Sequence, residues 1–369
     1  MTLEKAARIT SIDLLRGIIM VIMALDHTRD FFHFDVIHNS PENLYTTSVY
    51  LFFTRWITHY CAPTFIILAG ISAYLYGQRP GVNLSRFLLT RGLWLILVEL
   101  IVIRYGWMSI FLSLHFVFQV IWAIGISMIF LSLIRRLPYI VILTIGLLII
   151  FLHNLTDGIV YDGSSPLGIL WTLLHVQGMV NIGAVHIYVF YPVLPYFGLI
   201  SVGYCLGKLF TPSTSVQMRK RVLLFAGLSC IGLFIVLRYI NIYGDPQPWS
   251  KQFEPLFTFI SFIRVCKYPC SLLFILMTVG PALLFLRFFE NTNNAITKIF
   301  LVFGRVPMFY YILHLYIIHF LAMAMGGNKY HLWQVYIIWL GIVTSLYFPC
   351  KWYSTYKSSH PSKWWLSYL

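Results

Sequence analysis

The segment 8–34, RITSIDLLRGIIMVIMALDHTRDFFHF, is where residue types and spacing point to chemistry. An uninterrupted apolar run, 18–25, separates Arg16 from His27. Ionisable groups in a membrane-length helix are costly and usually face a protein interior or a water-filled space, so they are functional candidates. Arg16 and His27 are close to three helical turns apart, so both would project from one face, about 16 Å apart along the axis.

Carboxylates accompany both of these side chains. Asp13 comes one turn before Arg16, whereas Asp26 and Asp30 lie on either side of His27. A neighbouring carboxylate favours the imidazolium and fixes the tautomer of a histidine, which suits a general base working near neutral pH. We therefore predict that His27 is a catalytic base whose ring is held by Asp26 or Asp30. Arg16 would be oriented by Asp13.

Two further stretches place polar side chains on one face of a helix. In RWITHYCAPTFIILAG, Arg55 and His59 are one turn apart, and Pro63 can kink the helix just beyond them. In GRVPMFYYILHLYIIH, Tyr310 and His314 are four residues apart and share a face. We expect these four polar residues to be second-tier members of the same site.

For the other basic residues and histidines, a simple structural role is an alternative to a functional role. Arg305 lies near a predicted helix boundary, where snorkelling toward the headgroups is the plain alternative to binding an anion. Lys267, beside Pro269, could anchor a helix or could hold an anionic group. A lone intramembrane histidine is more often a hydrogen-bonding link between helices than a base. That interpretation is preferred for His115, His153, His186 and His331.

Composition indicates an integral membrane protein. Apolar residues make up 59% of the 369 residues and charged residues only 10%, whereas soluble chains carry about a quarter charged residues. The 26 basic residues outnumber the 12 acidic ones, but no basic stripe or stacking motif accompanies them, so a nucleic-acid partner is not expected. The six cysteines lack CxxC spacing, so they predict packing residues and no metal site.

The sequence predicts one all-α domain over residues 1–369, a polytopic membrane bundle of about ten transmembrane helices. A spanning helix needs about 20 apolar residues. On that basis the predicted spans are 9–26, 50–76, 87–103, 110–133, 139–153, 185–210, 222–240, 269–288, 299–325 and 332–348. Segments 167–180 and 257–265 are predicted to be re-entrant or interfacial.

Lysine and arginine are concentrated in alternate loops, which predicts the orientation in the membrane. Arg79 and Arg86 fall on the same side as the N-terminus, and so do Arg219 and Lys220. Both termini should therefore be cytoplasmic, in the plasma (inner) membrane. His27 would then lie near the outer surface of the membrane.

Six stretches together resemble a bacterial family of multi-pass membrane proteins. They are SIDLLRGIIMVIMALDH, THYCAPTFIILAG, YPVLPYFGLISVGYCLGKLF, KYPCSLLFILMTVGP, GRVPMFYYILHLYIIH and the closing WWLSYL. That family is related to the catalytic domain of heparan-α-glucosaminide N-acetyltransferase. The spacing Arg16-x10-His27 is also similar to the first-helix signature of the wider membrane acyltransferase superfamily, which acylates cell-envelope carbohydrates.

The resemblance implies transfer of an acyl group, acetyl above all, from cytoplasmic acyl-CoA to a hydroxyl or amine on the outer side. Arg16, with Asp13 and Arg305, would bind the CoA end of the donor. His27 would take the acceptor's proton or, less readily, become acetylated itself. The resemblance leaves His33 and His38, in the loop after this helix, open as alternative bases. His59, as a second-tier residue of the same site, is a further candidate.

The predicted partners are the lipid bilayer, acyl-CoA and an envelope glycan or other carbohydrate acceptor, with a homodimer left open. The outer loop 157–183 is expected to fold back over the site and help to select the acceptor. Three other classes stay open. They are a secondary transporter, which usually shows internal repeats that we do not find, a b-type haem protein with two axial histidines, and a structural scaffold.

Overall fold

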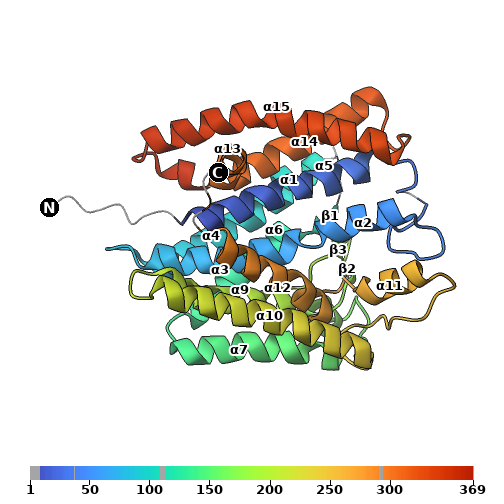
Figure 1. Ribbon diagram of the computed structural model, residues 1–369, viewed down its shortest axis with the longest axis horizontal. Coiled ribbons are helices and arrows are strands. Elements are labelled where there is room, and N and C mark those ends of the chain that lie inside the picture. The colour runs from blue at the N-terminus through green and yellow to red at the C-terminus, as the bar shows by residue number, and fades with distance from the viewer. Residues whose placement is uncertain (1–8, 37, 109–113, 291, 293, 369) are drawn as a thin grey trace.

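Residues 10–32 form one continuous helix, α1 (Thr10–Phe32), in the computed structural model, which describes residues 9–36, 38–108, 114–290, 292 and 294–368. Buried side chains lie on several sides of this helix, Leu14, Ile19 and Ala24 among them. A helix that is apolar nearly all round belongs inside a bundle. Figure 1 shows α1 passing between the other long helices.

The described helices that follow α1 surround it in an elongated bundle (Figure 1). They are α2 (Val49–Thr58), α3 (Cys61–Gly77), α4 (Leu84–Val98), α5 (Arg104–Met108), α6 (Val120–Ile134), α7 (Tyr139–Leu152), α8 (Pro166–Leu174), α9 (Val193–Leu206), α10 (Val216–Ile240), α11 (Pro255–Ile263), α12 (Leu272–Phe288), α13 (Ala295–Arg305), α14 (Pro307–Met325) and α15 (Leu332–Ser359). A π-helical segment (Glu99–Ile103) joins α4 to α5.

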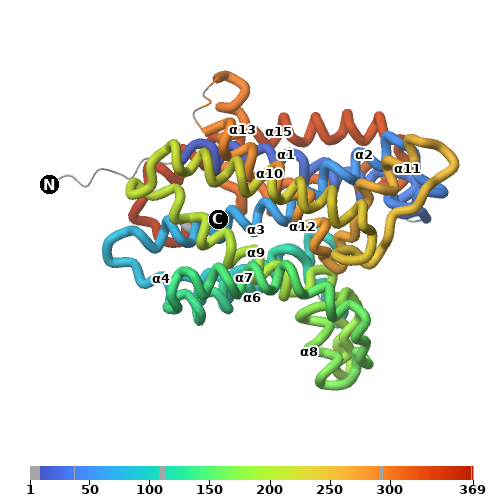
Figure 2. Tube along the Cα trace, turned by 60° about the horizontal axis from the view of Figure 1, so that its bottom comes forward, coloured from blue at the N-terminus to red at the C-terminus, as the bar shows by residue number. Residues whose placement is uncertain are grey.

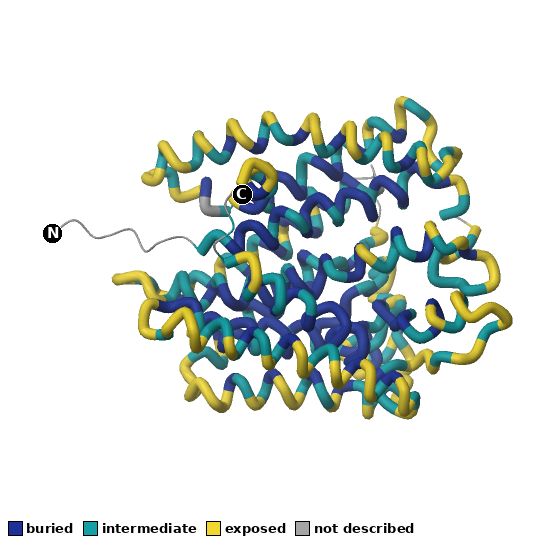
Figure 3. The backbone as a smooth tube through the Cα atoms, viewed as in Figure 1, coloured by how far each residue is buried: buried dark blue, intermediate teal, exposed yellow. Residues whose placement is uncertain are grey.

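Several of these helices are long and apolar enough to cross a membrane. Within the described residues there are six such stretches: Val49–Gly77, Tyr139–Thr156, Val193–Phe210, Val216–Ile240, Pro307–Met325 and Leu332–Ser359. Figure 3 shows buried backbone at the centre of the bundle and exposed segments along outer helices such as α15 and α7. The prediction of a helical membrane bundle is confirmed, whereas the number ten stays a prediction.

Several predicted spans have different boundaries in the structure, and three of them illustrate the causes. The span 185–210 begins with a strand, β3 (Val185–Val189), so its helix begins only at Val193. The span 299–325 consists of two helices, because Pro307 lacks a backbone N–H and starts a new helix after Val306. In the span 110–133, residues 110–113 lie outside the described ranges and the helix begins at Val120.

A small three-stranded sheet and α8 form a lobe beside the bundle, here called the side lobe (residues 115–118 and 154–189). Strand β3 lies between β1 (His115–Phe118), to which it is parallel, and β2 (Gly178–Ile182), to which it is antiparallel. The segment 167–180 therefore contributes to α8 and β2. Figure 2 shows α8 projecting away from the bundle, whereas we expected loop 157–183 to fold back over the site.

Helices α1 and α13 cross where each has a glycine. A Cβ atom added to Gly17 would lie 1.9 Å from the carbonyl oxygen of Phe300, and one added to Gly304 would lie 1.8 Å from that of Asp13. Only a residue without a side chain permits two helix backbones to approach this closely. The crossing places the C-terminal end of α13 against the turn of α1 that carries Asp13 and Arg16.

Gly304→Ala is expected to destabilise the protein by about 1–3 kcal/mol, because the added methyl group would overlap backbone atoms of α1. The melting temperature of the purified protein in detergent would measure this effect. Gly341→Ala is the matched control, since a Cβ at this position of α15 meets nothing within 4 Å. Equal melting temperatures for the two variants would contradict the interpretation of the crossing.

Candidate active site

A pair of histidines from two helices lies at the centre of the site. His27 Nδ1 on α1 and His314 Nε2 on α14 are 2.8 Å apart. The second ring nitrogen of His314, Nδ1, is 3.0 Å from the carbonyl oxygen of Tyr310. A carbonyl oxygen can only accept, so His314 Nδ1 carries a proton and His314 Nε2 has a lone pair. His27 therefore donates from Nδ1 and keeps a lone pair on Nε2.

His27 is the more exposed member of this pair. His314 is completely buried, whereas His27 retains part of its exposed surface. The indole of Trp107 on α5 packs edge-on against the His27 ring at a centroid distance of 5.0 Å, and Tyr311 lies at 6.2 Å. These contacts fix the plane of the imidazole and leave Nε2 as the basic atom of the pair.

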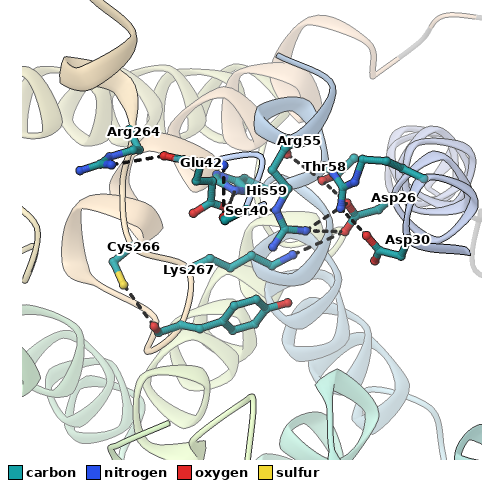
Figure 4. A network of polar contacts seen from close by, with 12 residues as sticks. Asp26, Asp30, Ser40, Glu42, Arg55, Thr58, His59, Arg264, Cys266 and Lys267 are labelled. Carbon is teal, nitrogen blue, oxygen red and sulfur yellow. Dashed lines mark hydrogen bonds and ion pairs between the residues drawn. The ribbon is translucent and has the colours of Figure 1, made fainter. Parts of the chain in front are cut away.

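Asp26 is the centre of a separate ionic network beside the histidine pair (Figure 4). Arg55 Nη1 donates to both of its carboxylate oxygens, at 3.0 and 2.9 Å. Thr58 Oγ1 donates to Asp26 at 2.9 Å, and Arg29 Nη2 lies 2.7 Å from the same oxygen. Lys267 Nζ is 3.8 Å from the other carboxylate oxygen of Asp26, Oδ2. Cations from α1, α2 and the loop after α11 thus neutralise Asp26.

The other predicted carboxylate, Asp30, pairs with Arg29 at 2.6 Å. Both aspartates flank His27 in the sequence and were therefore candidates to hold its ring. In the structure the hydrogen bond of His27 Nδ1 is made with His314 instead. Arg29 also belongs to α1, and its side chain is only 2% exposed.

Glu42, which no motif in the sequence singled out, joins the loop between α1 and α2 to α2. Its Oε1 atom accepts from Arg55 Nε at 2.9 Å and lies 3.1 Å from His59 Nε2. Figure 4 shows Arg55 between Glu42 and Asp26. The second-tier residues Arg55, His59 and Lys267 therefore belong to the ionic network, whereas Tyr310 and His314 belong to the histidine pair.

The ionic network predicts a particular loss of stability in acid. Burial raises the pKa of Glu42, but the hydrogen bonds and charges of His59 and Arg55 outweigh it and hold the pKa well below its ordinary value of 4.5. The stabilisation is therefore present above pH 4.5 and is lost as the pH falls below it. Glu42→Gln should lower stability at neutral pH by about 1–3 kcal/mol and should flatten the acid side of the melting-temperature profile. Parallel profiles for variant and wild type would contradict this assignment.

Arg16 is held at the opposite end of α1 by three helices. Its Nη1 atom donates to Asp13 at 3.0 Å and lies 3.4 Å from the carbonyl oxygen of Gly304 on α13. Its Nη2 atom donates to Ser72 on α3 at 2.9 Å. The Asp13–Arg16 pair predicted from spacing is thus present. Arg305 is exposed at the C-terminal end of α13, and the carbonyl oxygen of its neighbour Gly304 contacts Arg16.

The two loop histidines that were left open as bases occupy different surroundings. His33 caps the C-terminal end of α1 and is buried, with its ring 4.8 Å from that of Phe34, and burial lowers its pKa. His38 is exposed in the loop. Among the contacts of the described residues, His314 pairs with His27 and not with His33 or His38.

A family model described as the catalytic region of heparan-alpha-glucosaminide N-acetyltransferase matches residues 8–241. No curated protein gives a match to the chain. The matched region contains Arg16, His27, Glu42 and Arg55, whereas His314 comes from the part of the chain beyond it. The match covers more than half of the chain and confirms the resemblance seen in the sequence. The chain belongs to the family of the heparan-α-glucosaminide N-acetyltransferase catalytic domain.

Proposed function

We propose that this membrane protein is an acetyltransferase that takes the acetyl group from acetyl-CoA, or another acyl group from its acyl-CoA, at the Arg16 end. The acceptor would be a carbohydrate hydroxyl or amine at the His27 end. The family match supports group transfer of this kind. The lone pair on His27 Nε2, imposed by the contacts of His27 with His314 and of His314 with Tyr310, is the observation that carries the proposal.

His27 would act as a general base. Its Nε2 atom takes the proton from the acceptor O–H or N–H while the acceptor atom forms a bond to the thioester carbonyl carbon. The carbon–sulfur bond then breaks, and the proton passes from His27 to the departing CoA thiolate. The imidazolium formed between these steps keeps its Nδ1–H directed at His314 Nε2, so the ring need not turn over during the reaction.

Arg16 would hold an anionic part of the donor. Its guanidinium is partly exposed, with 16% of the side-chain surface accessible. Arg16 and His27 lie about 16 Å apart along α1. A donor anchored by its phosphates at Arg16 must therefore be extended along the helix to bring its thioester to His27.

The experiment that tests this proposal is acetyl transfer by purified protein in lipid. Radiolabelled acetyl-CoA is supplied with amino sugars, neutral sugars and extracted envelope glycans, and labelled product is separated from donor. We expect time-dependent labelling of a carbohydrate. A protein that neither binds nor hydrolyses acyl-CoA with these acceptors present would overturn the proposal. A Soret absorption band in the purified protein would favour the haem alternative.

The proposed direction of transfer depends on both termini being cytoplasmic, in the plasma membrane. Figure 1 shows the beginning of α1 and the end of α15 at the same end of the bundle. A cysteine introduced at Asn39 should react with a membrane-impermeant maleimide added outside the cell, whereas one introduced at Arg219 should not. The reverse pattern would place the Arg16 end outside and exclude cytoplasmic acyl-CoA as the donor.

A further inference from the structure

The side lobe presents apolar side chains that its own small core leaves uncovered. The core of the lobe includes Val180 and Val189, which are fully buried. Outside it, Leu155, Val160 and Leu170 are 67%, 85% and 52% exposed. Leu155 lies in a short 3₁₀-helix, Val160 in the loop after it and Leu170 in α8. A large exposed apolar surface of this kind marks a contact with a protein or a membrane.

This apolar surface is continuous with the outside of a membrane-spanning helix. The span Tyr139–Thr156 includes α7, whose Leu148 and Leu152 are exposed on the outside of the bundle. Leu155 follows Leu152 by one helical turn and leads directly into the lobe. The exposed face of α7 is a surface for lipid, so the neighbouring apolar residues of the lobe adjoin the same lipid.

The charges of this region favour lipid over a charged partner. Residues 137–207 contain neither lysine nor arginine and only two carboxylates, Asp157 and Asp162. Asp157 lies 3.0 Å from His175 Nε2, and Asp162 accepts the backbone N–H of Ser164 at 3.0 Å. Both carboxylates therefore already have contacts within the lobe, whose exposed surface offers mainly apolar groups.

We propose that the side lobe lies on the membrane surface at the His27 end and inserts its exposed apolar side chains at the boundary between headgroups and acyl chains. Turns with exposed backbone groups cannot enter the hydrocarbon core, so the lobe lies at this boundary and does not span. Figure 2 shows the lobe projecting sideways from one end of the bundle, as this arrangement requires.

The position of the lobe also bears on the site. Strand β3 leads into Tyr191, whose hydroxyl oxygen is 3.2 Å from that of Tyr268. Tyr268 follows Lys267, which contacts the ionic network through Asp26. A lobe seated on the membrane surface therefore fixes the depth at which this network lies.

The test uses the full chain in lipid nanodiscs that hold one copy each, with the native cysteines replaced. Leu170→Cys, on α8, carries an environment-sensitive fluorophore. The matched control is Lys251→Cys, in the exposed loop between α10 and α11. Nitroxide-labelled lipid should quench the label at position 170 several-fold more than the label at 251, and aqueous iodide should show the opposite preference.

Iodide quenching at position 170 equal to that at position 251 would overturn the proposal. Loss of lipid quenching at position 170 in discs holding two copies would show that a second copy of the chain covers the apolar surface of the side lobe. That result would also overturn the proposal. Val160→Cys supplies an independent position if Leu170→Cys does not yield folded protein, as judged by its melting temperature. None of these readouts depends on acetyl transfer.

Discussion

His27→Ala is expected to lower acyl transfer by about 10²–10⁴-fold, the usual effect of removing a general base. The protein should still fold, because His27 is partly exposed and contributes less packing than its completely buried partner, His314. The rate should be measured with radiolabelled acetyl-CoA on purified protein in lipid. His38→Ala is the matched control, since this exposed loop histidine should leave the rate unchanged.

The partner of His27 allows a sharper test of the same mechanism. His314→Leu removes the atom that accepts from His27 Nδ1, so the tautomer with a lone pair on Nε2 is no longer imposed. His314→Gln retains an acceptor and should recover part of the rate, with a pH profile closer to that of the wild type. A His27→Ala variant with wild-type transfer would move the base to His33, His38 or His59.

Arg16→Ala is expected to raise the KM for acetyl-CoA about 10- to 100-fold with a smaller change in kcat, because hydrogen bonds to a charged group contribute about 1.5–3 kcal/mol. High donor concentration should then restore part of the rate. Initial rates over a range of acetyl-CoA concentrations separate the two constants. A KM equal to that of the wild type would remove Arg16 from the donor site.

The same substitution could act through folding, because it leaves the Asp13 carboxylate, only 7% exposed, without the guanidinium. Breaking a buried ion pair in this way costs about 3–5 kcal/mol. The double variant Asp13→Asn, Arg16→Gln removes both charges. If it folds as stably as the wild type but still binds acetyl-CoA weakly, the role of Arg16 is in donor binding. If donor binding recovers with folding, the pair is structural.

The sequence alone determined the features that depend on one segment of chain. Composition identified a membrane protein, since few charged residues can be placed in a bilayer. Helical periodicity placed Asp13 and Arg16 on one face, and they form an ion pair because residues three apart are neighbours on any helix. The same periodicity selected His27 as a polar residue that must face the interior.

Periodicity could not identify the partner of His27. Asp26 precedes it directly, but successive side chains of a helix point about 100° apart, and Asp26 turns toward Arg55 on α2. His314 lies 287 positions away on α14, and Trp107 follows a π-helical segment. Which helices stand beside α1 depends on how the whole bundle packs, including the close crossing at Gly17 and Gly304. Tertiary structure therefore decided which nitrogen of His27 donates to His314 and which one keeps its lone pair.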